Sequence, residues 1–320
     1  MRQPLGNLSS CEYEHPSDKL ALENLRKVPV LPKLIELVQT PANSIGRLKY
    51  AASFVRLNER QLPSVYRLLR EACEILEVDE PALYLESSGE MNAYVMCADR
   101  PIICLTSQLV DVFDEDEMMF VLGHELAHIK AGHLVYKTLA YYMQLGMLEA
   151  VLALVPGAGL VSGGMAAALN YALFSWYRAG ELTCDRGGYL ACQNFGASCK
   201  ALMKLAGWSA KHVNEMDIGE FMAQAREYED AGAETFGAVQ KLILSFSATT
   251  HPFAVERVSE LLKFHEGGAY LDVLQRKTEI AAGQNLKEPA EPPVPVGEAA
   301  KEALKSVKKL GGSLVSKFRP

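Results

Sequence analysis

The apolar positions in the first half of the chain follow a helical period and then change to a strand period. Between residues 32 and 78 they recur every three or four positions, which predicts two or three amphipathic helices. Three short segments rich in strand formers come next, at 82–86, 93–97 and 102–105. The turn sequence 98–101 separates the last two segments. The pattern therefore predicts a small antiparallel sheet that ends in a hairpin.

Helices are predicted again after the sheet. Four acidic residues crowd the turn 114–117, where they favour the positive end of a helix dipole, and the helix should continue to about Val135. A long helix is predicted from about Asn170 to Asn194, and further helices over 198–264. The expected fold class is therefore α+β and mostly helical.

Composition divides the chain into four parts. Residues 1–30 are polar and predict an N-terminal extension, and the main domain is expected over 31–275. Residues 280–298 are rich in proline and predict a linker. In 299–320 apolar residues recur every three or four positions among basic ones. This tail is typical of a helix that lies on an anionic membrane or docks on a partner, and a frayed, solvated tail is the alternative.

Residues 138–177 contain one charged side chain, Glu149. Pro156 and the glycines beside it divide the stretch into two apolar arms, so we predict a helical hairpin. The hairpin is either buried in a soluble domain or inserted in a membrane. A contact with a membrane surface would therefore use 138–177 or the tail 299–320.

Charge and cysteine content limit the partners and the compartment. Lys plus Arg is 32 and Asp plus Glu is 39, which gives a net charge of −7. Such a chain lacks the basic face that nucleic-acid binding requires, so no nucleic-acid partner is expected. Seven cysteines without a CxxC pair indicate a reducing compartment. The N-terminus has no apolar core of a signal peptide, so we expect a cytoplasmic location, with membrane association left open.

The strongest chemical signal is Gly-His-Glu-Leu-Ala-His-Ile-Lys-Ala-Gly-His at residues 123–133. His124 and His128 are four positions apart, so on a helix they share one face. Two imidazoles placed in this way can hold one zinc ion at ~2.0–2.1 Å. Glu125 can then reach a water on the metal and act as its general base, without being a ligand. The alternative is a chance match, because HExxH fixes only three residues.

A catalytic zinc site needs a third protein ligand and an open position. Glu181 and Asp185 are also four positions apart on a predicted helix. Glu181 can complete a His-His-Glu set, and Asp185 can accept a hydrogen bond from the far nitrogen of a ligand histidine. Alternatively, both carboxylates belong to a solvated face paired with Arg178 and Arg186.

These motifs, in this order, resemble the HtpX / CAAX prenyl endopeptidase family of gluzincin metallopeptidases. The resemblance spans roughly residues 60–265. It rests on His124-Glu125-xx-His128 with His133, on Glu181-xxx-Asp185, and on Thr250-His251-Pro252-xxxx-Arg257. The chain differs from the membrane-integral members because it lacks their N-terminal membrane spans. Gly187-Gly188 is also flexible for the middle of a helix, which we interpret as close helix packing near the site.

The resemblance implies a zincin-like fold with HExxH on the active-site helix, and a zinc-dependent metalloendopeptidase. It implies one zinc per chain, with Glu125 as the catalytic base and these metal ligands: His124, His128 and Glu181. It also implies that Asp185 and Arg257 support the ligands without binding the metal. His251 is placed near the cleft, either as the donor to the oxyanion or as a further metal ligand. It could instead be a surface histidine before Pro252.

The predicted strand before the helix also offers a place for a substrate. Its edge residues are Asn92, Ala93, Tyr94 and Val95. An extended peptide can add to such an edge, so we expect a peptide or protein substrate. Two alternatives are a catalytically silent protein of this fold, acting as a chaperone or membrane-associated scaffold, and a membrane-surface module with a structural zinc. No cysteine has the ligand spacing that structural zinc favours.

Overall fold

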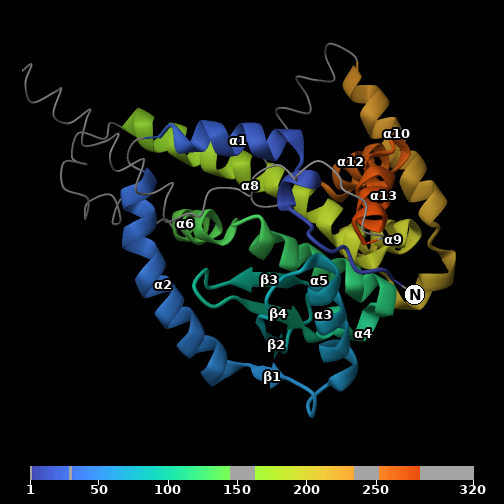
Figure 1. Ribbon diagram of the computed structural model, residues 1–320, viewed down its shortest axis with the longest axis horizontal. Helices are drawn as coiled ribbons and strands as arrows, with labels where there is room; N and C mark the ends of the chain where they lie inside the picture. Colours follow the sequence, from blue (N-terminus) through green and yellow to red (C-terminus); the bar gives the residue numbers. More distant parts are fainter. Residues whose placement is uncertain (1, 29–30, 145–162, 234–251, 282–320) are drawn as a thin grey trace, which may run out of the picture.

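The computed structural model describes residues 2–28, 31–144, 163–233 and 252–281 (Figure 1). The helices are η1 (Ser10–Glu12), α1 (Pro16–Arg26), α2 (Leu31–Ser53), α3 (Pro63–Leu76), α4 (Ser107–Val112), α5 (Glu115–Lys130), α6 (Leu134–Gln144), α8 (Gly163–Cys192), α9 (Phe195–Ala206), η3 (Ala210–Glu215), α10 (Ile218–Ala233), α12 (Ala254–Glu266) and α13 (Ala269–Ala281). The strands are β1 (Val55–Leu57), β2 (Ala82–Glu86), β3 (Ala93–Met96) and β4 (Ile102–Thr106). The predicted α+β, mostly helical fold class is confirmed.

The four strands form one sheet in the order β1-β2-β4-β3. All five residues of β4 are buried, which suits its position between two neighbours, whereas β3 is partly exposed and lies at the edge. β3 and β4 form the expected antiparallel hairpin, but β2 runs parallel to β4. The sheet is therefore mixed rather than purely antiparallel. After β2 the chain first forms β3 at the sheet edge, and it then returns to place β4 between β2 and β3.

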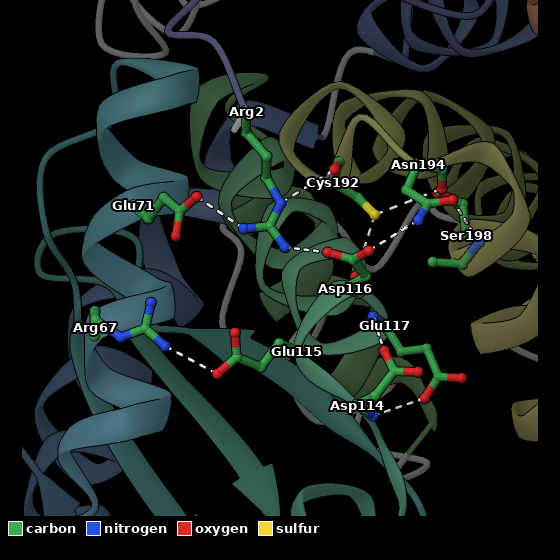
Figure 2. A network of polar contacts seen from close by, with 11 residues as sticks. Arg2, Arg67, Glu71, Asp114, Glu115, Asp116, Glu117, Cys192, Asn194 and Ser198 are labelled. Atoms are coloured by element: carbon green, nitrogen blue, oxygen red, sulfur yellow. Dashed lines mark hydrogen bonds and ion pairs between the residues drawn. The ribbon is translucent and has the colours of Figure 1, made fainter.

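α5 lies between this sheet and α8 (Figure 1). Its first turn forms as the acidic run predicts. The Asp114 carboxylate accepts a hydrogen bond from the Glu117 N–H at 3.0 Å, and the Glu117 carboxylate accepts one from the Asp114 N–H at 2.8 Å (Figure 2). This reciprocal pair satisfies two amide donors that a helix start leaves unpaired.

The end of α5 differs from the prediction. The helix stops at Lys130, not near Val135, and α6 begins at Leu134. Gly132 has a φ of +71°, the left-handed conformation that glycine adopts without strain. The apolar period continues through this turn, so the spacing alone did not show the break.

α8 brings the second carboxylate motif to α5 at very short range. It begins at Gly163, before the predicted start at Asn170. A Cβ atom at Gly187 would lie 2.4 Å from the Cβ of Ala127, and one at Gly188 would lie 2.6 Å from the Phe120 carbonyl oxygen. The close helix packing expected from the glycine pair is therefore confirmed.

The N-terminal segment 2–28 packs into the fold instead of extending from it. Its apolar side chains are buried against the same core as α5: Leu5, Leu8 and Tyr13. Arg2 ties the segment to three elements (Figure 2). Its guanidinium donates to Glu71 at 2.8 Å and to the Cys192 carbonyl at 3.2 Å, and it also contacts Asp116. The polar residues of the segment therefore lie mainly on its outer face.

Several sequence predictions concern residues outside the described ranges. They are His251, the middle of 138–177, nearly all of the linker 280–298, and the tail 299–320. In the part of the chain that the structure describes, no helix combines the length and apolarity needed to cross a membrane. Contact of these segments with a membrane surface stays a prediction.

Replacing Gly188 with alanine tests the close packing. In an open helix this change gains up to about 1 kcal/mol, because alanine loses less backbone entropy. Here the new methyl group meets the backbone of α5, so we expect the free energy of unfolding to fall by about 1–3 kcal/mol in urea denaturation. Gly196→Ala is the control, because its Cβ would make only an ordinary 3.6 Å contact. Stabilisation by Gly188→Ala would contradict the packing account.

Candidate metal centre

The carboxylate of Glu181 bridges the two histidines of α5. Its Oε2 lies 3.2 Å from Nε2 of His124, and its Oε1 lies 3.2 Å from Nε2 of His128. Four ligands around a zinc ion at ~2.0–2.2 Å place neighbouring ligand atoms about 3.3–3.6 Å apart. The three side chains are buried and close enough to share one ion. The donor set and its spacing therefore fit a zinc ion.

Glu125 lies beside this set with an unpaired oxygen. Its side chain is buried, and within the described ranges its Oε2 has no hydrogen-bond partner. A buried carboxylate oxygen without a partner is costly, so the site suits a water or metal that the chain does not supply. Glu125 also lines a cavity of about 480 Å³ together with His124, Glu181 and the start of the β3 edge, Asn92 and Ala93.

Asp185 and Arg257 hold His124 from the other side. Nδ1 of His124 lies 3.0 Å from Oδ1 of Asp185. Arg257, on α12, donates to both oxygens of Asp185, at 2.8 and 2.5 Å. Burial raises the pKa of Asp185, but the guanidinium outweighs it and holds that pKa below its usual value. Asp185 is therefore a charged hydrogen-bond acceptor for Nδ1 of His124. The other ring nitrogen, Nε2, faces Glu181.

The two histidines differ in charge when no metal is bound. Burial lowers the pKa of His124, yet hydrogen bonds to Asp185 and Glu181 outweigh this and raise it to about 9. Burial, together with the charge of Lys137, lowers the pKa of His128, which stays neutral. Burial also disfavours the charge of Lys137, but Tyr177 and the nearby carboxylates raise its pKa above the ordinary value. The site therefore holds a lysine cation close to the ligands.

The structure places the remaining predicted residues as follows. Asn92 and Ala93 line the cavity, whereas Val95 is buried in the core and the Tyr94 hydroxyl donates to Glu86 at 2.7 Å. Successive strand residues face opposite sides, so the four residues cannot all face a substrate with their side chains. His251 lies outside the described residues.

A second group of possible ligands shares His128 with the first: His128, His133 and Cys184. It fits a metal less well. Nε2 of His133 is already 3.1 Å from Asp18, and burial raises the pKa of the Cys184 thiol well above its usual value. A thiol is a much poorer ligand than a thiolate.

Sequence reasoning gave His133 no role and missed Asp18 altogether. His133 appeared only as part of the motif, and Asp18 lies in the segment that polarity assigned to an extension. For His133, the usable signal was its position directly after Gly132, because a glycine there can end the motif helix. For Asp18 there was no local signal, because its partners are far away in the sequence.

Comparison with known proteins adds the family. The model of Peptidase family M48 matches residues 59–265. The chain belongs to this family of zinc metallopeptidases. The predicted HtpX resemblance is therefore confirmed, and the M48 assignment supports a protease. No solved structure matches this M48 chain significantly.

Two relatives of the M48 chain come from a plant and a bacterium. "Plastoglobule-localized metallopeptidase 48, chloroplastic" from Arabidopsis thaliana is 31% identical over 283 residues, which cover 88% of this chain and 80% of the relative. "Protease HtpX homolog" from Burkholderia multivorans is 26% identical over 238 residues, covering 67% and 78%. Because one relative is named for a chloroplast structure, the cytoplasmic location of this chain stays a prediction.

The pKa of His124 predicts how zinc affinity depends on pH. Below about pH 9 the metal-free His124 carries a proton that zinc must displace. We therefore expect affinity to rise by about ten-fold per pH unit up to that pKa and to level off above it. Competition with a chelator of known pH dependence measures this. A flat profile between about pH 6 and 9 would show that His124 is not protonated before metal binds.

Proposed function

We propose that this chain is a zinc-dependent endopeptidase with one zinc per chain, held by His124, His128 and Glu181. The observation that carries the proposal is the position of the Glu181 carboxylate, 3.2 Å from each imidazole. Structural zinc sites are closed and usually rich in cysteine. Here His124 and Glu181 instead line an accessible cavity, which favours a catalytic site.

The chain's own residues supply the proton transfers. When bound, zinc polarises a peptide carbonyl and lowers the pKa of a water to ~7. Glu125 takes a proton from the attacking water and later delivers it to the leaving amine, and its unpaired Oε2 in the cavity supports this role. Asp185 and Arg257 keep His124 oriented throughout.

His251 is the proposed donor to the negative charge that develops on the carbonyl oxygen, with a further metal ligand as the alternative role. Its neighbour in sequence, Pro252, lines the cavity, and so does Arg257 on the helix that follows. The residues that follow His251 therefore lie at the cavity, which supports the proposed donor role.

The substrate is proposed to be an extended peptide that adds to β3. Thr106 N–H donates to the Asn92 carbonyl at 3.0 Å, so Asn92 is turned toward β4. In an antiparallel ladder the next residue, Ala93, then turns its N–H and C=O away from β4. Ala93 lines the cavity beside Glu125, so a peptide paired there would lie along the site. The catalytically silent alternative has no observation in its favour.

Glu125→Gln tests the general base. The amide keeps the size of the side chain but cannot accept the proton, so cleavage of an unfolded casein-type substrate should fall about 10²–10⁴-fold at unchanged zinc content. Glu115→Gln, on the exposed first turn of the same helix, is the matched control and should keep full activity. Undiminished turnover in Glu125→Gln would refute the assignment.

His124→Ala tests the ligand set by metal analysis. The wild type should contain about one zinc per chain, and the variant should contain almost none because two ligands and a vacant site hold zinc poorly. A full zinc content in the variant would rule out this ligand set.

Ala93→Pro tests peptide addition to the sheet edge. Proline removes the outward N–H without breaking the ladder to β4, a change that edge strands tolerate. The loss of one main-chain hydrogen bond should lower kcat/KM for a peptide by roughly 3- to 10-fold. Ala93→Ser keeps the N–H and is the control. Unchanged kcat/KM in Ala93→Pro, with normal zinc content, would exclude this binding mode.

A further inference from the structure

The turn after α5 places a histidine against the far side of the proposed ligand His128. His133 N–H donates to the His128 carbonyl at 3.0 Å, and Gly132 N–H donates to the Ile129 carbonyl at 3.1 Å. These two bonds, with Gly132 in the left-handed conformation, form a Schellman motif. The turn brings Nδ1 of His133 to 3.1 Å from Nδ1 of His128.

The other ring nitrogen of His133 meets a buried carboxylate from the N-terminal segment. Nε2 of His133 lies 3.1 Å from Oδ2 of Asp18, which is fully buried on α1. Thr183 on α8 donates to the same oxygen at 2.6 Å, and the His133 ring stands edge-on to Trp176. Figure 1 shows α1 lying along α8, which is what delivers Asp18 to this point.

The order of donors along this chain of contacts follows from chemistry. A carboxylate only accepts, so Nε2 of His133 carries the proton that bonds to Asp18. In a neutral imidazole Nδ1 is then an acceptor, and both of its neighbours can donate: Nδ1–H of His128, and the Cys184 thiol at 3.6 Å. Glu181 faces Nε2 of His128 at 3.2 Å and competes for the same proton in the metal-free protein. A metal bound at Nε2 would leave the proton on Nδ1, where His133 accepts it.

We propose that His133 and Asp18 are positioning residues that fix the tautomer and ring orientation of His128, so that its Nε2 is ready to bind metal. The inference rests on the proposed zinc site. Asp185 contacts Nδ1 of His124 directly, whereas the carboxylate of Asp18 reaches His128 only through His133. Asp18 precedes the residues 59–265 that match the family model, so the N-terminal segment takes part in forming the site.

The tautomer can be read directly from the zinc-loaded, full-length wild type. Nitrogen-15 labelling of histidine gives separate NMR signals for protonated and unprotonated ring nitrogens, and His133→Phe identifies the signals of His133. We expect a protonated Nε2 and an unprotonated Nδ1 on His133, because Asp18 accepts from Nε2 and His128 donates to Nδ1. A protonated Nδ1 on His133 would overturn the proposal.

Zinc affinity, measured by competition with a chelator, tests the consequence. His133→Phe removes the acceptor and should weaken zinc binding roughly 10- to 100-fold, and Asp18→Asn should weaken it about 10-fold. Glu260→Gln is the matched control. It removes the charge of the carboxylate that lies 3.0 Å from His15, at the start of α1, but leaves Asp18 in place, so affinity should not change.

The outcomes separate this inference from the proposed function. If the wild type binds no zinc, the metal site itself fails. If the wild type binds zinc and folded Asp18→Asn and His133→Phe bind it equally well, the positioning role is wrong while the metal site stands. Circular dichroism establishes that each variant is folded.

Discussion

The placement of one carboxylate midway between two imidazoles is the interaction on which the site depends. Glu181 comes from α8, while His124 and His128 come from α5, so the helices must approach closely for a single side chain to reach both rings. Glycines at 187 and 188 remove the Cβ atoms that would hold the helices apart. Helix packing thus sets the 3.2 Å distances between the Glu181 carboxylate and the two imidazoles before any metal is considered.

Each of the two proposed histidine ligands also contacts a buried group through its other ring nitrogen. Asp185 keeps its charge because Arg257 donates to both of its oxygens. On the other side, His133 lies between His128 and the carboxylate of Asp18. Buried charges are costly unless they are paired, so these networks tolerate few changes. The proposed zinc ion would add a positive charge beside Glu181 in this part of the core.

The parts of the site that follow a helical period could be predicted from the sequence. The four-residue spacings of His124 with His128 and of Glu181 with Asp185 imply one face of a helix, and the structure brings these faces together. The parallel pairing of β2 with β4 was not predictable, since hairpin signals do not tell which strand is inserted between two others. Asp18 was missed because its role depends on a tertiary contact in a segment whose composition is polar.

X-ray absorption spectroscopy of the zinc-loaded protein tests the central claim most directly. Nitrogen and oxygen ligands scatter at ~2.0–2.2 Å, whereas a cysteine sulfur scatters at ~2.3 Å. Coordination by His124, His128 and Glu181 predicts two imidazoles with light oxygen ligands and no sulfur. A sulfur in the first coordination sphere would instead assign the metal to the group that contains Cys184, and would contradict the account.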